Sequence, residues 1–365
     1  MMRDQPLNPE VLSALAESLP SPVLAEPMAH TARLEWSGRH DGTDAFRLTL
    51  GYPVRGAESL YAGPVSRALE AAIGRPVTVT VGFEIQGFPE SRNQPIPPGV
   101  RNLVAVASAK GGVGKSTVAA NLALGLRALG ARVGLLDADI YGPSQPAMFG
   151  VAPGERPETD GQKIEPLNRH GIALMSIGFL VDVNQAMIWR GPMVTQALQQ
   201  LLYQTRWPEL DYLVIDLPPG TGDIQLTLAQ RVPLSGAVVV TTPQDIAVLD
   251  ARRGIRLFEK VEVPILGIVE NMSQYHCPER GHVARIFGHG GGEALARECG
   301  VRWLGELPLV PGLCEQMDRG APPVATDPAS ALAQAFVMLA HRTGASLASV
   351  LHTRAPPPEI IIEGN

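Results

Sequence analysis

A glycine-rich segment at residues 108–117, with the sequence SAKGGVGKST, constrains the fold of this chain more than any other feature. An apolar run typical of a buried parallel strand precedes it at 103–107, and a helical pattern follows it at 118–129. In the order strand, glycine-rich loop and helix, backbone N–H groups and the helix N-terminus point at one site, which favours phosphate groups. The segment therefore predicts a phosphate-binding loop.

Two side chains of this loop have chemistry suited to a nucleoside triphosphate. Lys115 would reach the β- and γ-phosphates, and the Ser116 hydroxyl would ligate Mg²⁺. The usual pattern begins with glycine, but this chain has Ala109 there, and alanine resists a positive φ where glycine does not. A glycine-rich turn that binds nothing is the alternative, which the Gly-Lys-Ser spacing disfavours. We expect the nucleotide to contact Ala109, Lys110, Gly111, Gly112, Val113, Gly114, Lys115, Ser116 and Thr117.

The bulk properties of the chain exclude several function classes. At 365 residues and 45% hydrophobic content, it can form one large domain and a small one. Its net charge of −6 provides no overall basic field for nucleic acid or anionic lipid. The sequence shows neither a long apolar span nor a signal peptide, so we expect a cytoplasmic protein without a membrane partner. Cys277, Cys299 and Cys314 are too few and too unevenly spaced for a disulfide framework.

Four segments follow one another along the chain. Residues 1–88 are predicted to form a small α/β domain, and 89–99 a proline-rich linker. Residues 100–344 are predicted to form the phosphate-binding domain, and 345–365 a partly disordered tail. The small domain carries patterns of two helices, a hairpin and a further strand, at 8–19, 34–36, 46–50, 62–73 and 76–81.

Strand and helix patterns alternate in the larger domain. The strand candidates are near-continuous apolar runs, as expected for strands covered on both faces. They lie at 103–107, 133–137, 173–177, 212–216, 237–241, 265–269 and 303–304. This alternation predicts the α/β class, with a doubly wound, mostly parallel sheet.

Two of these strands end in aspartate. Ligands of open α/β sheets bind outside the carboxyl ends of the strands, so Asp137 and Asp216 are candidates for the site. An aspartate at a strand end is often only a helix cap. Beside a phosphate loop, however, an apolar strand ending in Asp216 matches the arrangement in which the carboxylate holds Mg²⁺ or its water.

The sequence KGGVGKST at 110–117 resembles the deviant Walker motif of dimeric P-loop ATPases, which include MinD, ParA, nitrogenase iron protein and the Mrp-type (ApbC) iron–sulfur carriers. The resemblance implies ATP hydrolysis by a homodimer, in which Lys110 reaches the partner's phosphates as an arginine finger does. It further implies that Asp139 orients the attacking water, that Asp137 and Asp216 surround Mg²⁺, and that Asn271 recognises adenine.

Longer strings narrow the resemblance to the Mrp-type carriers. These are DADIYGPS at 137–144, WRGPM at 189–193, DLPPGTGD at 216–223 and ENMS at 270–273. The similarity extends over about 102–324 and implies that the chain loads or delivers iron–sulfur clusters. The partners would then be client apoproteins or an assembly scaffold.

The chain departs from these carriers at Cys277. They place a Cys-x-x-Cys pair there, and two pairs are thought to hold a [4Fe–4S] cluster between subunits. Here the second position is Arg280. A guanidinium stays charged and only donates hydrogen bonds, so it cannot ligate iron. A dimer would therefore offer two thiolates rather than the ordinary four.

Three interpretations of this departure remain open. Cys277 could pair across the dimer, with further ligands from His276, His282, an external thiol or a client. Cys299 or Cys314 could substitute for the missing cysteine. Alternatively, cluster binding is lost, and an ATP-driven switch or adaptor remains.

Two further hypotheses are a histidine metal site and a positioning ATPase that binds a membrane or DNA. His276, His282 and His289 invite a metal-site interpretation, although loop histidines near glycines are usually solvated. A positioning ATPase of the MinD or ParA kind predicts a basic amphipathic C-terminal helix or a basic DNA-facing patch. The sequence PPPEIIIEGN at the C-terminus disfavours that alternative.

Overall fold

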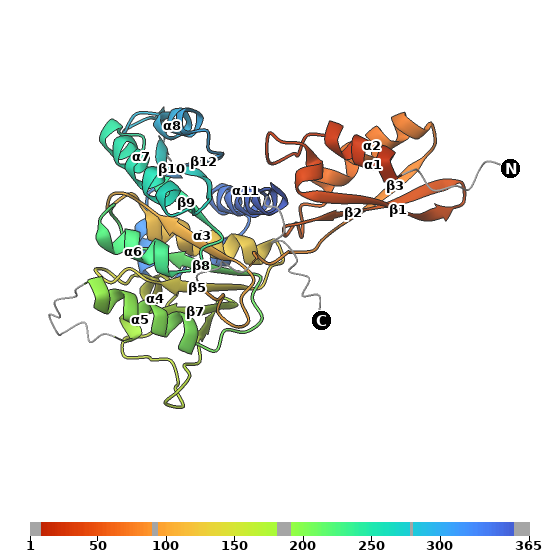
Figure 1. The fold of residues 1–365 in the computed structure, drawn as a ribbon. Helices are drawn as coiled ribbons and strands as arrows, with labels where there is room; N and C mark the ends of the chain where they lie inside the picture. Colours follow the sequence, from red (N-terminus) through yellow and green to blue (C-terminus); the bar gives the residue numbers. More distant parts are fainter. Residues whose placement is uncertain (1–8, 90–93, 181–190, 278–279, 354–365) are drawn as a thin grey trace.

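The computed structural model describes residues 9–89, 94–180, 191–277 and 280–353. Two sheets organise them (Figure 1). The smaller has the order β1-β2-β3, with β1 (Ala32–His40) antiparallel to β2 (Thr43–Leu50) and β2 parallel to β3 (Val77–Phe83). Asp41 and Gly42 both have positive φ between β1 and β2, as a tight hairpin turn requires. Helices α1 (Pro9–Ser18) and α2 (Ser59–Ile73) pack on this sheet, and η1 (Met28–His30) precedes β1.

The larger sheet has the order β11-β10-β9-β4-β8-β5-β7-β6 in the described part of the chain, and β12 also pairs with β10. Its strand pairs are parallel except for β6 with β7 and β10 with β11. The predicted doubly wound, mostly parallel sheet is confirmed. The strands are β4 (Leu103–Ala107), β5 (Val133–Asp137), β6 (Leu167–Arg169), β7 (Ile172–Ser176), β8 (Tyr212–Asp216), β9 (Gly236–Thr241), β10 (Ile265–His276), β11 (Val283–Ala284) and β12 (Trp303–Leu309).

Helices cover both faces of this sheet, which is why its central strands β4, β5, β8 and β9 are buried along their whole length. One face packs against α3 (Lys115–Ala128) and α11 (Ala331–Thr353). The other packs against α5 (Gly191–Gln204), α6 (Asp223–Arg231) and α7 (Asp245–Lys260). The remaining helices are α4 (Gln145–Met148), η2 (Ile177–Phe179), α8 (Gly291–Cys299), α9 (Leu313–Asp318) and α10 (Pro323–Thr326).

Helix α11 belongs to both parts of the molecule and lies between them in Figure 1. Its Ala345 and Ala348 are buried in the apolar core of the smaller unit, and the His341 ring is 2.9 Å from the Tyr61 hydroxyl of α2. The predicted boundary at 344 therefore falls inside a helix. The expectation of a tail from 345 is wrong up to Thr353, because small and apolar side chains pack this stretch against the core. Residues 354–365 lie outside the described residues.

None of the helices in the described part of the chain is long and apolar enough to cross a bilayer.

Candidate functional site

The phosphate loop joins β4 to the first residue of α3, Lys115. Gly112 and Gly114 have φ values of 80° and 81°, which disfavour any side chain. A Cβ at Gly114 would also lie 2.2 Å from Asn271 Nδ2, so the loop and β10 approach too closely for a larger residue. Ala109, by contrast, is not among the residues with positive φ. The alanine that replaces the usual glycine therefore causes no backbone strain.

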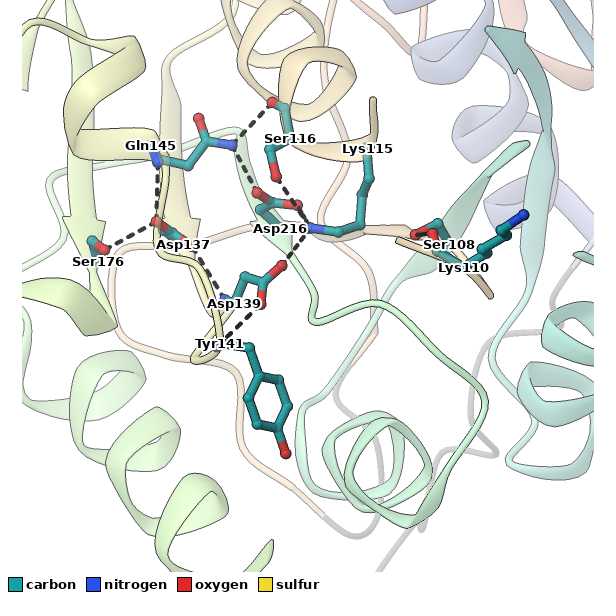
Figure 2. Close-up of polar contacts among 10 residues, drawn as sticks. All are labelled: Ser108, Lys110, Lys115, Ser116, Asp137, Asp139, Tyr141, Gln145, Ser176 and Asp216. Atoms are coloured by element: carbon teal, nitrogen blue, oxygen red, sulfur yellow. Dashed lines mark hydrogen bonds and ion pairs between the residues drawn. The ribbon is translucent and has the colours of Figure 1, made fainter. Parts of the chain in front are cut away.

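Lys115 and three aspartates meet at the carboxyl edge of the large sheet (Figure 2). Asp137 and Asp216 end the neighbouring strands β5 and β8, whose parallel register pairs these two residues. The Lys115 ammonium contacts the Asp216 carboxylate, lies 3.3 Å from Asp139 Oδ2, and lies 3.3 Å from the Ser116 hydroxyl. Lys115 is 5% exposed and Asp216 is fully buried.

The electrostatics of this cluster favour an added cation. Burial lowers the pKa of Lys115, but the charges of Asp216 and Asp139 outweigh it, so the net shift is upward. Burial, together with the charge of Asp216, raises the pKa of Asp137 to about 8. Burial also raises the pKa of Asp139, although Lys115 opposes that shift. Three buried carboxyl groups thus lie around one ammonium, an arrangement that favours a further positive charge nearby.

Neighbouring groups orient these carboxylates. Asp137 accepts hydrogen bonds from the backbone N–H groups of Asp139 and Gln145, each at 3.1 Å, and from the Ser176 hydroxyl at 3.0 Å. Gln145 and Ser176 were missed by sequence reasoning. Ser176 could have been found from its place at the end of an apolar strand. That strand, β7, pairs with β5, and the register places Ser176 opposite Asp137.

The donor set fits Mg²⁺. This ion prefers oxygen ligands and is usually held by one or two carboxylates plus substrate phosphates and water. The Ser116 hydroxyl, Asp137 and Asp216 supply such oxygens beside the loop. Within the described ranges, no group of three or more His, Cys, Asp or Glu is placed to hold a metal ion alone. Phosphate oxygens and water would complete the coordination of Mg²⁺ at such a site.

Lys110 and Asn271 differ in how their side chains lie relative to the site. The exposed Lys110 side chain points away from the carboxylate cluster in Figure 2, while the Ser108 hydroxyl donates to its backbone carbonyl at 2.9 Å. The buried Asn271 amide donates to the Val113 carbonyl at 2.9 Å. Asn271 is therefore held against the phosphate loop. The predicted adenine contact and the contact of Lys110 with a partner's phosphates stay predictions.

Cys277 lies just beyond β10, in the loop that leads to β11. Its N–H donates to the His282 carbonyl, and its carbonyl accepts from Gly281 N–H, each at 2.9 Å. The side chain is partly buried, whereas Arg280 and His282 are exposed. Residues 278 and 279, between Cys277 and Arg280, lie outside the described residues.

The other candidate metal ligands are dispersed. Cys299 ends α8 and packs at the edge of an apolar cluster, where burial raises the pKa of its thiol. Cys314 is exposed on α9, 3.8 Å from Asp318 Oδ2. In the part of the chain that the structure describes, His276, His282 and His289 form no metal-binding group. The histidine-patch hypothesis therefore finds no support within one chain.

Comparison with known proteins places this geometry in a family. The family model described as ParA, NUBPL iron-transfer P-loop NTPase, matches residues 99–343. The chain belongs to this family. The predicted P-loop NTPase class and the resemblance to iron–sulfur carriers are thereby confirmed. The string at 189–193, also quoted for that resemblance, lies partly outside the described residues.

Several relatives carry informative names. The iron-sulfur cluster carrier protein of Haemophilus influenzae is 51% identical over 309 residues, covering 84% of each chain. Its Escherichia coli K12 namesake is 57% identical over 257 residues, covering 70% of this chain and 69% of that one. The iron-sulfur cluster transfer protein NUBPL of Dictyostelium discoideum is 51% identical over 239 residues, covering 65% of this chain and 74% of that one.

Solved structures agree with the fold. A nucleotide-binding protein from Archaeoglobus fulgidus, in complex with ADP, is 38% identical with a TM-score of 0.54, and the match covers 61% of this chain and 88% of that one. The septum site-determining protein MinD of Pyrococcus horikoshii is 22% identical with a TM-score of 0.50, covering 66% of this chain and 94% of that one. At that identity the MinD match supports the fold alone.

Proposed function

We propose that this chain is an ATP-hydrolysing carrier that loads iron–sulfur clusters or delivers them to apoproteins. The observation that carries the proposal is the Lys115–Asp216–Asp139 cluster beside the phosphate loop, in a chain 51% identical over 309 residues to a named cluster carrier. The proposed partners are a second copy of the chain and client apoproteins or a scaffold. Neither a nucleic acid nor a membrane is proposed as a partner, and the cytoplasmic location stays a prediction.

The site residues divide the chemistry of ATP hydrolysis among themselves. Lys115 is proposed to neutralise the β- and γ-phosphates, and Asp139 to orient the attacking water. Mg²⁺, held by Ser116, Asp137 and Asp216, would supply charge neutralisation at the phosphates. Lys110 is proposed to complete the partner's site, because its side chain is exposed and directed away from its own cluster.

Strand β10 offers a direct connection between nucleotide and cargo. Asn271 in this strand holds the phosphate loop through Val113, and Cys277 follows the end of the same strand. Six residues separate the two, although the strand is irregular between Asn271 and Tyr275, where Met272 has a positive φ of 60°. A movement of the phosphate loop would therefore reach the cargo cysteine through one continuous element.

The cluster is the cargo, and its ligands are the unusual part of the proposal. Cys277 is proposed as the thiolate that each protomer contributes. Since Arg280 cannot ligate iron, the remaining ligands would come from His276 or His282, from an external thiol or from the client. The same Arg280 favours a second candidate function, a dimeric ATPase switch or adaptor that has lost cluster binding.

Anaerobic reconstitution with iron and sulfide separates the two functions. Iron and acid-labile sulfide would be counted per dimer for the wild type, for Cys277→Ala, and for Cys314→Ala, which tests whether the exposed Cys314 substitutes for the missing ligand. A carrier is expected to bind a cluster that Cys277→Ala loses and Cys314→Ala keeps. No cluster in any of the three proteins, even with glutathione added, would contradict the carrier function and favour the switch or adaptor.

A further inference from the structure

Gln145 is a fully buried residue that connects three segments of the site. It follows the loop after β5, and its backbone N–H holds Asp137 at 3.1 Å. Its side-chain Nε2 donates to Asp216 Oδ2 at 2.8 Å and to the Ser116 carbonyl at 3.0 Å. Figure 2 shows the amide between these acceptors. One side chain therefore ties the end of β8, the first turn of α3 and the loop after β5 together.

The orientation of this amide is determined by its partners. Asp216 and the Ser116 carbonyl can only accept hydrogen bonds, so the NH₂ group must face them. The oxygen Oε1 is consequently turned away, and it is buried without a hydrogen-bond partner. An apolar side chain of similar size would remove this unpaired acceptor, but it would leave Asp216 Oδ2 and the Ser116 carbonyl without their donor. The glutamine is therefore explained by its two donors, which hold the carboxylate and the first turn of α3.

We propose that Gln145 is a positioning residue for the Mg²⁺ site, which couples the loop at 139–144 to the metal-binding carboxylate. By holding one oxygen of Asp216, it directs the other toward the Lys115 ammonium, which also lies 3.3 Å from the Ser116 hydroxyl, where the cation and phosphates are proposed to bind. When that loop moves, Gln145 moves with it, and Asp216 loses its fixed orientation. This inference rests on the proposed nucleotide site and deepens it.

The test is Gln145→Met, which keeps the length of the side chain and removes both donors. Binding of a fluorescent ADP analogue would be titrated in EDTA and again with increasing Mg²⁺. We expect affinity in EDTA to stay within about twofold, while the Mg²⁺ concentration for half-maximal effect rises about tenfold. Gln225→Met is the matched control, because Gln225 on α6 is also buried with an unpartnered Oε1. It should leave the Mg²⁺ requirement unchanged.

A second variant keeps the test possible if Gln145→Met does not fold. Gln145→Asn retains a buried amide but is one methylene too short to reach both acceptors, so it should raise the Mg²⁺ requirement as Gln145→Met does. An unchanged Mg²⁺ requirement in either folded variant would overturn the inference. So would an equal fall in nucleotide affinity with and without Mg²⁺, which would indicate a merely structural role. If the wild type failed to bind nucleotide, the proposed function itself would be contradicted instead.

Discussion

Lys110 and Lys115 belong to one loop, yet the fold gives them opposite environments. Lys115 is buried against two carboxylates, and Lys110 is exposed with its side chain turned away from them. Lys110→Ala should therefore leave folding nearly unchanged and retain nucleotide binding. If Lys110 acts across the dimer as an arginine finger does, kcat for ATP hydrolysis should fall by about 10³-fold. Phosphate release and nucleotide titration measure the two effects, and unchanged turnover would contradict the role across the dimer.

Lys115→Ala should behave differently. It removes the phosphate-binding ammonium and also leaves Asp216 and Asp139 buried without their counter-charge. Hydrolysis should be lost, and the free energy of unfolding should fall by about 3 kcal/mol. Urea unfolding of both lysine variants, alongside the ATPase assay, checks this contrast. Full activity in Lys115→Ala would refute the assignment of the site.

At the same scale, the sequence predicts residues whose position follows from local pattern. Asp137 and Asp216 could be found because each ends an apolar strand, and the loop residues because their spacing is distinctive. Gln145 could not be found in this way. Its importance depends on three hydrogen bonds to segments that are distant in sequence from one another, and no local pattern encodes such a contact.

At the scale of elements, apolar runs locate strands but underestimate them where polar residues continue the pairing. The predicted strand at 265–269 is the first part of β10, which continues to His276 because it pairs with β12 and β11. Its polar half is stabilised inside the fold: the fully buried Glu270 carboxylate accepts from Gly290 and Gly292 N–H at 3.1 and 2.6 Å. Those partners come from a distant loop, so the alternation of residues alone does not reveal them.

The packing of α3 against α11 depends on Gly125. A Cβ there would lie 2.7 Å from the Ala340 Cβ and 3.1 Å from the Phe336 carbonyl oxygen. Gly125→Ala should therefore lower the free energy of unfolding by about 1–3 kcal/mol, although alanine favours helix. Gly254→Ala is the matched control in α7, where the nearest atom would be the Ala109 Cβ at 3.6 Å, and it should stabilise by about 0.4–1 kcal/mol. Urea unfolding measures both, and equal shifts would contradict the close helix contact.

At the scale of the whole molecule, helix α11 connects the smaller and the larger unit, which the sequence pattern does not indicate. Composition marked a change near 89–99, but α11 at the other end of the chain packs on both units. The residues near the C-terminal end of α11 are mostly small or apolar. This pattern does not indicate whether the helix packs in the core of the smaller unit or in that of the larger one. The two units consequently share polar contacts, among them the buried hydrogen bond between Tyr61 and His341.

The contact between Glu26 and Arg302 makes this connection testable. Glu26 accepts from Arg302 Nε and from the Ser349 hydroxyl, each at 2.6 Å. Burial alone would raise the pKa of Glu26, but the hydrogen bonds from Arg302 and Ser349 outweigh it and lower the pKa below its ordinary value of 4.5. Because the folded state has the lower pKa, the stabilisation is complete above pH 4.5 and is lost as the pH falls through the folded pKa.

Glu26→Gln should accordingly lower the free energy of unfolding by about 1 kcal/mol at neutral pH. The difference from the wild type should shrink at a pH well below 4.5, where the wild-type carboxyl is itself protonated. Glu298→Gln is the control, since the Arg252–Glu298 pair at 2.5 Å is exposed and should contribute little. A difference for Glu26→Gln that is independent of pH, or one equally large for the control, would show that the charge of Glu26 does not join the two units.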